Sequence, residues 1–235
     1  MMKRILTLLA GLAASMTLAL AQPESLSVYT SSSEVVHLNM FSHTGYGFHF
    51  VSKGEFTANT FGNGEFFLNI LDLNIRPVEA FEIKLGADIA FNHFHSKDYA
   101  FYQTGGDAHL MKAVKFADMP SLAGSYSETM GYFGNFFFSF PLLLKAHIDG
   151  FSFGAGAEAN LNISGNNGYR YRQDYKRTDI KEEKLGMNLF SYGIIATLSY
   201  NGAGLYFKYY PASSRILADG SAAFSYWTLG VCFGL

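Results

Sequence analysis

The sequence has little of what marks three common classes of protein. It contains one cysteine, Cys232, in 235 residues, which excludes an intramolecular disulfide framework. Its 17 basic and 19 acidic residues leave a formal charge of −2, whereas a nucleic-acid-binding domain is usually clearly basic. Beyond residue 21 no apolar run reaches the length of about 18 residues that a transmembrane helix needs. Disulfide scaffolds, nucleic-acid binders and helical membrane proteins are therefore not expected.

The start of the chain has the form of a secretory signal peptide. A basic start and an almost entirely apolar run precede Ala19-Leu20-Ala21, the small-residue pattern of a cleavage site. The alternative is an uncleaved anchor, but the run is short for a spanning helix. No cysteine follows it, which excludes a lipoprotein signal. We predict export, with residues 1–21 as the signal peptide and residues 22–41 as a polar periplasmic lead-in.

Strict alternation of apolar and polar residues predicts long β-strands in the rest of the chain. From Phe151 to Ser164 the odd positions are apolar, and the even positions are small or polar. Aromatic residues, 17% of the chain, stand at the ends of such segments, as at Phe190 and Tyr200. These segments exceed the roughly five or six residues usual in a soluble sandwich. They match transmembrane β-strands of about nine to eleven residues, which are apolar toward lipid and have aromatic girdles at both interfaces.

The connections between these segments alternate in length. Eight strands are expected, at about 42–52, 65–76, 80–95, 132–147, 151–164, 187–201, 203–211 and 222–235. Tight turns alternate with longer loops at 53–64, 96–131, 165–186 and 212–221. This asymmetry is typical of outer-membrane barrels, whose short turns face the periplasm. The sequence predicts an all-β fold, an eight-stranded antiparallel up-and-down transmembrane β-barrel over residues 42–235, with both mature termini in the periplasm.

Two strands carry more specific expectations. The last ten residues, YWTLGVCFGL, are predicted to close the barrel by pairing with the segment around Tyr46–Phe50, because an open edge is not stable in lipid. Their large side chains would face lipid, while Gly230 and Cys232 would leave room in a crowded lumen. In the second strand Asn69 interrupts the apolar face, which suggests a β-bulge.

One hairpin resembles a known family. The segment FPLLLKAHIDGFSFGAGAEANL, Phe140 to Leu161, is similar to the central part of the small outer-membrane β-barrel proteins of the Bacteroidota that are called PorT-like. The resemblance implies an eight-stranded barrel in the outer membrane, and the protein that gives the family its name is linked to type IX secretion. Such membership implies fold and location better than it implies a task.

The resemblance and the fold together suggest a role without catalysis. We expect a non-enzymatic structural or accessory component of an outer-membrane complex, without a cofactor. Its expected partners are outer-membrane lipids, lipopolysaccharide and other outer-membrane or periplasmic proteins, and not nucleic acid. A lipid A-modifying enzyme is the alternative, and a small pore is a more distant one.

Charged residues on the predicted inward faces are the first candidate site. Four acids and four bases are involved: Asp72, Arg76, Glu82, Lys84, Asp88, Lys145, Glu158 and Lys208. Side chains fill the interior of an eight-stranded barrel, and an unpaired buried charge is costly, so we predict that these residues pair into a polar plug. Separate solvation by lumen water is the alternative. Asp88 and Glu158 would also suit acid–base catalysis, but structural pairing is favoured because a filled lumen excludes substrates.

The alternative enzyme has its own candidate residues. His93 and His95 share an outward face near the external end of the third strand, and a histidine there would activate a serine such as Ser96. Glu128 or Asp98 would be the third member. In a regular strand, however, Ser96 points to the opposite face, and the simpler interpretation is a pair of interfacial histidines. No catalytic residue is therefore predicted.

The long loops are the expected docking sites. Loop 165–186 interleaves tyrosines with a basic group suited to lipopolysaccharide phosphates, or it is simply a solvated charged loop. That group consists of Arg170, Arg172, Lys176 and Arg177. Loop 96–131 is unusually long, and its segment 108–114 is expected to form a short amphipathic helix. No His, Cys and carboxylate cluster has structural-zinc spacing, so no metal site is predicted.

Overall fold

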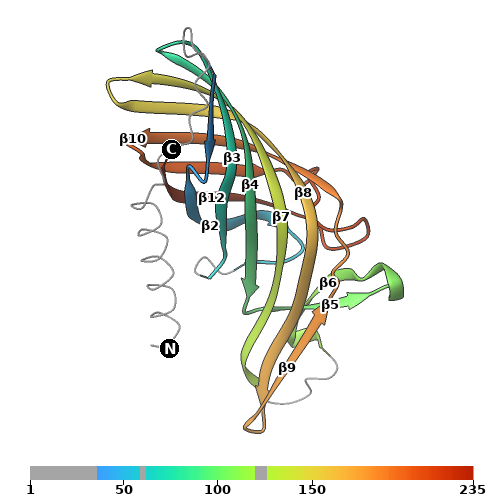
Figure 1. Cartoon of the computed structure of the whole chain (residues 1–235). Helices are drawn as coiled ribbons and strands as arrows, with labels where there is room; N and C mark the ends of the chain where they lie inside the picture. Colours follow the sequence, from blue (N-terminus) through green and yellow to red (C-terminus); the bar gives the residue numbers. More distant parts are fainter. Residues whose placement is uncertain (1–35, 59–61, 120–125, 235) are drawn as a thin grey trace.

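One antiparallel β-sheet dominates the molecule. The computed structural model describes residues 36–58, 62–119 and 126–234, so the expected signal peptide and most of the expected lead-in lie outside the described residues. Eight strands form a closed ring in the order β3, β2, β12, β11, β10, β8, β7, β4 and back to β3 (Figure 1).

Among the described residues, no helix has the length and apolar character needed to span a membrane.

The eight ring strands agree with the eight expected from alternation. They are β2 (Thr44–Gly54), β3 (Gly64–Val78), β4 (Phe81–Ser96), β7 (Tyr126–Ile148), β8 (Phe151–Gln173), β10 (Phe190–Tyr200), β11 (Ala203–Tyr210) and β12 (Phe224–Phe233). Every ring pairing is antiparallel. The all-β class and the antiparallel ring of eight strands are thus confirmed.

The last strand closes the ring as predicted. In the pairing of β12 with β2, Trp227 lies opposite Phe50 and Val231 lies opposite Tyr46. The expected irregularity in β3 is also present, since the register with β4 shifts between Asn69 and Leu71.

The two ends of the ring differ in their connections. At one end, the short-turn end, tight turns join β3 to β4, β7 to β8 and β10 to β11. In the last of these turns Asn201 has a φ of 50° and Gly202 a φ of 82°, the left-handed pair that favours Asn-Gly in a two-residue hairpin. At the other end, the hairpin end, the connections are long, and Figure 1 shows β7, β8 and β9 projecting there beyond the ring.

The hairpin end departs from the expected loops. Instead of a short helix, segment 108–114 contains the end of a 3₁₀ turn (Gly106–Ala108) and strand β6 (Leu110–Lys115), which pairs with β5 (Tyr99–Thr104). The helix prediction is wrong because cross-strand pairing and the burial of Met111 favour the extended chain. A second 3₁₀ turn spans Phe116–Asp118.

Much of the expected loop 165–186 is strand as well. β8 continues to Gln173, and β9 (Lys176–Glu183) folds back on it. β7 likewise begins at Tyr126, within the expected loop 96–131, and pairs with this extension of β8.

A short strand extends the ring at the short-turn end. β1 (Val36–Met40), from the expected lead-in, pairs with the same edge of β3 that β2 uses further along. β1 and β2 thus act as one long strand that is interrupted at Phe41, where φ is 51°.

The faces of the ring have inverted polarity relative to a water-soluble protein. β10 alternates exposed and buried residues along its whole length, with the apolar residues exposed and small or polar residues mostly buried. Large apolar side chains are exposed on every ring strand, for example Phe48, Phe66, Leu85, Leu144, Phe153, Ile194, Leu205 and Leu229. The inward face holds charges, amides and glycines together with several aromatic rings.

Candidate functional site: the polar interior of the ring

The predicted inward charges are placed on the interior of the ring. Seven of them are at least 95% buried, and they are Asp72, Glu82, Lys84, Asp88, Lys145, Glu158 and Lys208. The eighth, Arg76, lies at the short-turn end with its side chain 46% exposed. Burial of so many charges is tolerable only where each meets an opposite charge or several hydrogen-bond donors.

One group of ion pairs lies toward the short-turn end. The Lys84 ammonium lies 2.8 Å from Asp72 Oδ2, and Arg76 Nε lies 2.6 Å from Glu82 Oε2. Lys145 lies opposite Glu82 in the pairing of β4 with β7, but its Nζ is 3.7 Å from Glu82 Oε1. Lys145 is therefore the most loosely paired cation of this group.

A second group lies in the middle of the ring and centres on Lys208. Its ammonium lies 2.7 Å from Glu65 Oε1 and 3.1 Å from Glu158 Oε2, and the Tyr210 hydroxyl donates to Glu158. Glu65 was missed by the sequence reasoning, although it is in phase with the inward Phe67 and Asn69. Glu158 and Asp88, considered above as a catalytic pair, belong to different groups, because Asp88 accepts from Asn69 at 2.9 Å.

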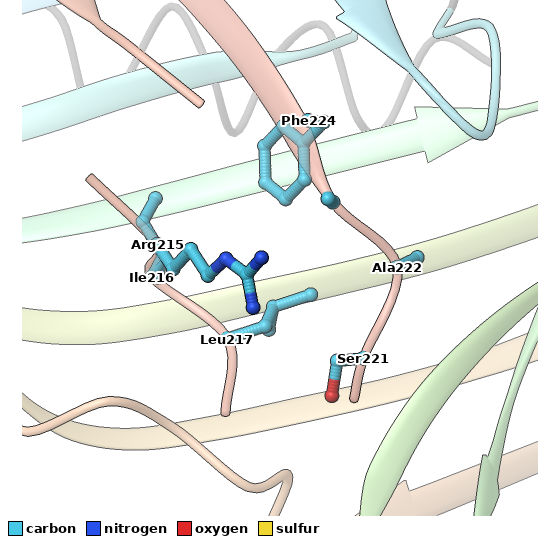
Figure 2. Close-up of a pocket in the computed structure, with 7 residues that line it drawn as sticks. Arg215, Ile216, Leu217, Ser221, Ala222 and Phe224 are labelled. Carbon is cyan, nitrogen blue, oxygen red and sulfur yellow. The ribbon is translucent and has the colours of Figure 1, made fainter. Parts of the chain in front are cut away.

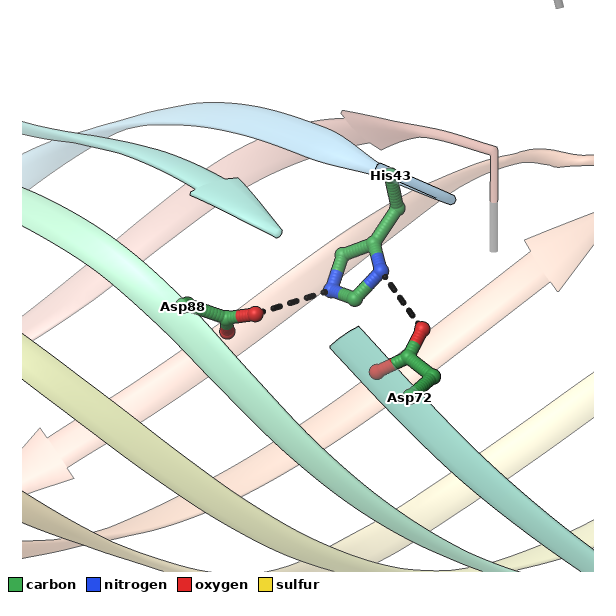
Figure 3. A group of neighbouring side chains, drawn as sticks. All are labelled: His43, Asp72 and Asp88. Carbon is green, nitrogen blue, oxygen red and sulfur yellow. Dashed lines mark hydrogen bonds and ion pairs between the residues drawn. The ribbon is translucent and has the colours of Figure 1, made fainter. Parts of the chain in front are cut away.

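His43 is a further inward residue that the sequence reasoning did not place with the charges. Figure 3 shows its imidazole between two carboxylates, with Nδ1 3.1 Å from Asp72 and Nε2 3.8 Å from Asp88. Its inward direction could have been predicted from the alternation of residues, since His43 stands at an odd position like the inward residues Gly45, Gly47 and His49.

The same three residues are the only described ones whose His, Cys, Asp or Glu ligand atoms gather closely enough to suggest a metal ion. The geometry fits a metal poorly, because opposite edges of the imidazole face the two carboxylates and one ion cannot lie on both. The Lys84 ammonium also lies 3.2 Å from His43 Nδ1 and already neutralises Asp72. The cluster is best described as a charge and hydrogen-bond network around Lys84.

Apolar side chains close the interior at the hairpin end. Phe94 stacks on Phe133 with ring centroids 4.5 Å apart. The rings of Phe224, Phe56 and Phe101 pack around this pair, at centroid distances of 5.2–5.8 Å from one or both of its rings. Loop residues complete the same buried cluster, including Leu185, Ile216, Leu217 and Ala222.

The space left beside this cluster is very small. Figure 2 shows the cavity between the segments 215–217 and 221–224, lined by Ile216, Leu217 and Phe224 among others. Its volume is about 10 Å³, at the lower limit for holding one water molecule. Among the described residues, this part of the hairpin end is therefore filled by packed apolar side chains.

The interior is open at the short-turn end instead. A cavity of about 240 Å³ lies there, lined by polar or charged side chains and by glycines. Lys84, Lys145, Glu82 and Asp72 form part of its wall.

The candidate catalytic group is not brought together. His93 Nε2 lies 2.7 Å from His95 Nε2 on the outer face, whereas Ser96 is fully buried and donates to the Thr57 carbonyl. Glu128 instead binds Arg172 at 2.5 Å. The expectation that Ser96 points away from the histidines is confirmed by its burial.

The candidate lipopolysaccharide residues lie on the β8–β9 hairpin. Arg172 pairs with Glu128, and Arg170 Nη2 lies 3.3 Å from the Met130 sulfur, so both are held against β7. Lys176 and Arg177 are exposed near the hairpin tip, where Arg177 makes a loose contact of 3.5 Å with Asp179.

Tyr132 of β7 anchors the base of this hairpin. Its hydroxyl donates to Asp179 Oδ1 at 3.1 Å. Partial burial and the Asp179 carboxylate raise the pKa of Tyr132 to about 12.

Comparison with models of known protein families finds no match, and comparison with curated proteins finds no significant similarity either. The features of the ring that bear on function are its outward apolar face, its ion-paired interior, the apolar cluster at its hairpin end and the polar cavity at its short-turn end.

Proposed function

We propose that this protein is an integral outer-membrane β-barrel with a side-chain-filled lumen, which acts as a structural or accessory component of an outer-membrane complex. The observation that carries the proposal is the belt of exposed apolar side chains around all eight ring strands, combined with an interior of buried charges. Monomeric soluble proteins rarely expose apolar patches of more than a few hundred Å². An apolar surface of this extent is stable in contact with the hydrocarbon of a lipid bilayer.

The height of the belt agrees with a bilayer. On β4 the outward apolar row extends from Phe81 to Phe91. At a rise of about 3.3 Å per residue and a tilt of roughly 40°, this row spans about 25 Å along the barrel axis, the usual height of the apolar band. Ring closure also supports the proposal, because an unpaired strand edge is not tolerated in hydrocarbon.

The orientation follows from the connections. Outer-membrane barrels place short turns in the periplasm and long loops outside. The short-turn end would then face the periplasm, and the β5–β6 and β8–β9 hairpins would face the exterior and lipopolysaccharide. The signal peptide expected from residues 1–21 is consistent with this export route.

The closed interior favours an accessory role over a pore. The apolar cluster around Phe94 and Phe133 blocks the hairpin end, and the ion pairs of Lys208 occupy the middle. Within the described chain, the β5–β6 and β8–β9 hairpins at the hairpin end are the proposed surfaces for a protein partner. The resemblance of the Phe140–Leu161 hairpin to PorT-like proteins makes a complex related to type IX secretion our proposed setting.

Single cysteines at the two ends test location and orientation. Tyr175, fully exposed at the β8–β9 tip, and Glu79, exposed in the β3–β4 turn, are replaced separately by cysteine. A membrane-impermeant maleimide added to intact cells should label Tyr175→Cys, and it should label Glu79→Cys only after permeabilisation. The native Cys232 is buried and provides the unlabelled background. Equal labelling of both variants in intact cells would contradict the proposed orientation.

The accessory role has a separate test. The full chain is extracted in mild detergent beside a variant in which Asp174–Arg177 at the β8–β9 tip is replaced by Asn-Gly. A stoichiometric protein partner that is lost from the tip variant would support docking on this hairpin. A barrel that purifies alone, with altered lipid A in a strain lacking the protein, would favour the enzymatic alternative.

A further inference from the structure

The cavity at the short-turn end has a wall of unusual chemistry. Its volume is about 240 Å³, and among the described residues no large apolar side chain lines it. Pockets for drug-like or lipid ligands are mostly apolar, so neither an acyl chain nor an aromatic molecule suits this wall. A small hydrophilic ligand does.

The charge of the wall is positive. Two carboxylates, Asp72 and Glu82, face three cationic side chains, Arg76, Lys84 and Lys145. Lys84 and Arg76 each hold one carboxylate at 2.8 Å and 2.6 Å, so the two acids are already engaged. The excess positive charge falls on Lys145, whose side chain is 5% exposed and lies 3.7 Å from the nearest carboxylate oxygen.

Two further wall atoms lack a hydrogen-bond partner within the described part of the chain. They are Asn74 Oδ1 and Ser152 Oγ, on residues that are each only 8% exposed. Buried polar atoms are normally satisfied, and each exception calls for a water or a ligand. Ser152 opposes His147 in the β7–β8 pairing, which places it diagonally across from Lys145 on the inward face.

We propose that this cavity binds a small oxyanion that also carries a hydroxyl, namely hydrogen phosphate or a phosphate monoester whose organic part carries a hydroxyl. The anionic oxygens accept hydrogen bonds from the Lys145 ammonium and the Ser152 hydroxyl, and the ligand hydroxyl donates to Asn74 Oδ1. Lysine is well suited to phosphate as a compact point charge with three donors. The ligand thereby satisfies one loosely paired cation and two unpartnered polar atoms together.

Isothermal titration of the full chain in detergent tests this site, with inorganic phosphate and glycerol 3-phosphate as ligands. Lys145→Met should weaken binding by about tenfold or more, because it removes a charge-assisted contact, and Ser152→Ala by about threefold. Folding of Lys145→Met is expected, since Glu82 keeps Arg76 as its partner. Lys53→Met, an exposed lysine at the opposite end of β2, makes the same charge change outside the cavity and should bind like the unmodified chain.

The two ligands separate two sources of phosphate. Preference for inorganic phosphate indicates a free ion, whereas equal or tighter binding of glycerol 3-phosphate indicates a phosphate monoester of a polyol. Either result supports the site if Lys145→Met weakens the binding of the preferred ligand. The proposal is overturned if neither ligand binds saturably, or if Lys145→Met and Ser152→Ala both bind as tightly as the unmodified chain.

Discussion

Lys208 illustrates how single residues stabilise an interior that is polar rather than apolar. Its side chain is 2% exposed, and its ammonium bridges Glu65 and Glu158, at 2.7 Å and 3.1 Å, across strands β11, β3 and β8. The ring of Phe67 also lies 4.9 Å from the ammonium, close enough for a cation–π contact. A residue of this kind links distant strands, and its loss leaves two carboxylates without their shared cation.

Replacement of Lys208 by methionine should therefore destabilise the fold by about 3–5 kcal/mol, the usual cost of leaving a buried charge unpaired. Reversible urea unfolding in detergent or lipid measures this loss. Lys181→Met is the matched control, because Lys181 and Glu183 are exposed and 3.5 Å apart, and such a pair contributes at most about 1 kcal/mol. Equal stability of the two variants would show that the Lys208 bridge contributes no more than a surface pair.

A second prediction at the residue scale concerns His43. Since Lys84 already neutralises Asp72 and the two imidazole nitrogens face different carboxylates, added zinc should leave the midpoint of thermal unfolding unchanged. Differential scanning calorimetry with and without zinc or a chelator measures this. A rise in the midpoint with zinc that disappears in His43→Ala would instead identify a metal site.

At the scale of the element, packing on both faces of β12 explains the alternation of large and small residues in its sequence. The ring of Tyr206 lies against the inward face of β12, and a Cβ on Gly230 would lie 2.4 Å from this ring and 2.6 Å from the Gly47 backbone. The alternation of large and small residues in β12 thus has two causes, an apolar exterior and a crowded interior. The expectation that Gly230 makes room inside the ring agrees with this contact.

Gly230→Val should destabilise the ring by roughly 1–3 kcal/mol, because overpacking forces the Tyr206 ring or the β2 backbone to move. The control is Val231→Leu, which changes a 42% exposed outward residue in the neighbouring position and should alter stability by less than about 0.5 kcal/mol. Heat-dependent gel mobility of the folded form provides the comparison. An unchanged unfolding temperature in Gly230→Val would be inconsistent with close packing at this site.

We expect lipopolysaccharide to bind near the tip of the β8–β9 hairpin. Lys176→Gln with Arg177→Gln should weaken binding severalfold, because these two cations are exposed near the tip. Arg172→Gln should have a smaller effect, since Arg172 already pairs with Glu128 at 2.5 Å. Surface plasmon resonance on immobilised lipopolysaccharide measures both. A larger loss from Arg172→Gln would place the contact at the base of the hairpin instead.

The ring strands could be predicted from sequence, and the hairpins could not, for one physical reason. Each ring strand separates two different environments, so residues such as those of β10 alternate with period two. β6 is held by β5 and by loop residues more than a hundred positions away, as in the bond from Ala222 N to the Met111 carbonyl. No local pattern encodes that contact.

The interior network shows the same division between local phase and long-range contact. Seven of the eight predicted charges are buried, as the phase of their strands predicts, whereas Arg76 at the end of β3 is 46% exposed. Glu65 and His43 have the same inward phase and are buried as well. The pairing of individual carboxylates with individual cations was not predictable. Lys208 and Glu65, for example, are far apart in sequence and come together only because the ring closes. The cavity at the short-turn end could likewise not be predicted, because its lining residues come from several strands and turns that are distant in sequence.

At the scale of the whole molecule, the proposed outer-membrane location requires the outer face of the ring to lie in lipid. Trp227, the single tryptophan, stands on the outward face of β12 and stacks on Phe50 with ring centroids 4.0 Å apart. It lies near the hairpin end of the strand, where outer-membrane barrels carry an aromatic girdle. The chain therefore contains a natural fluorescent reporter of its surroundings.

Quenching of Trp227 in vesicles of brominated phosphatidylcholine is the most direct measurement. The account predicts strong quenching by bromine on the acyl chains, little quenching by aqueous iodide, and the reverse after unfolding in urea. Vesicles of the same lipid without bromine are the control. Fluorescence that bromolipid leaves unchanged while iodide quenches it in the folded protein would contradict the central claim that the apolar belt faces the membrane.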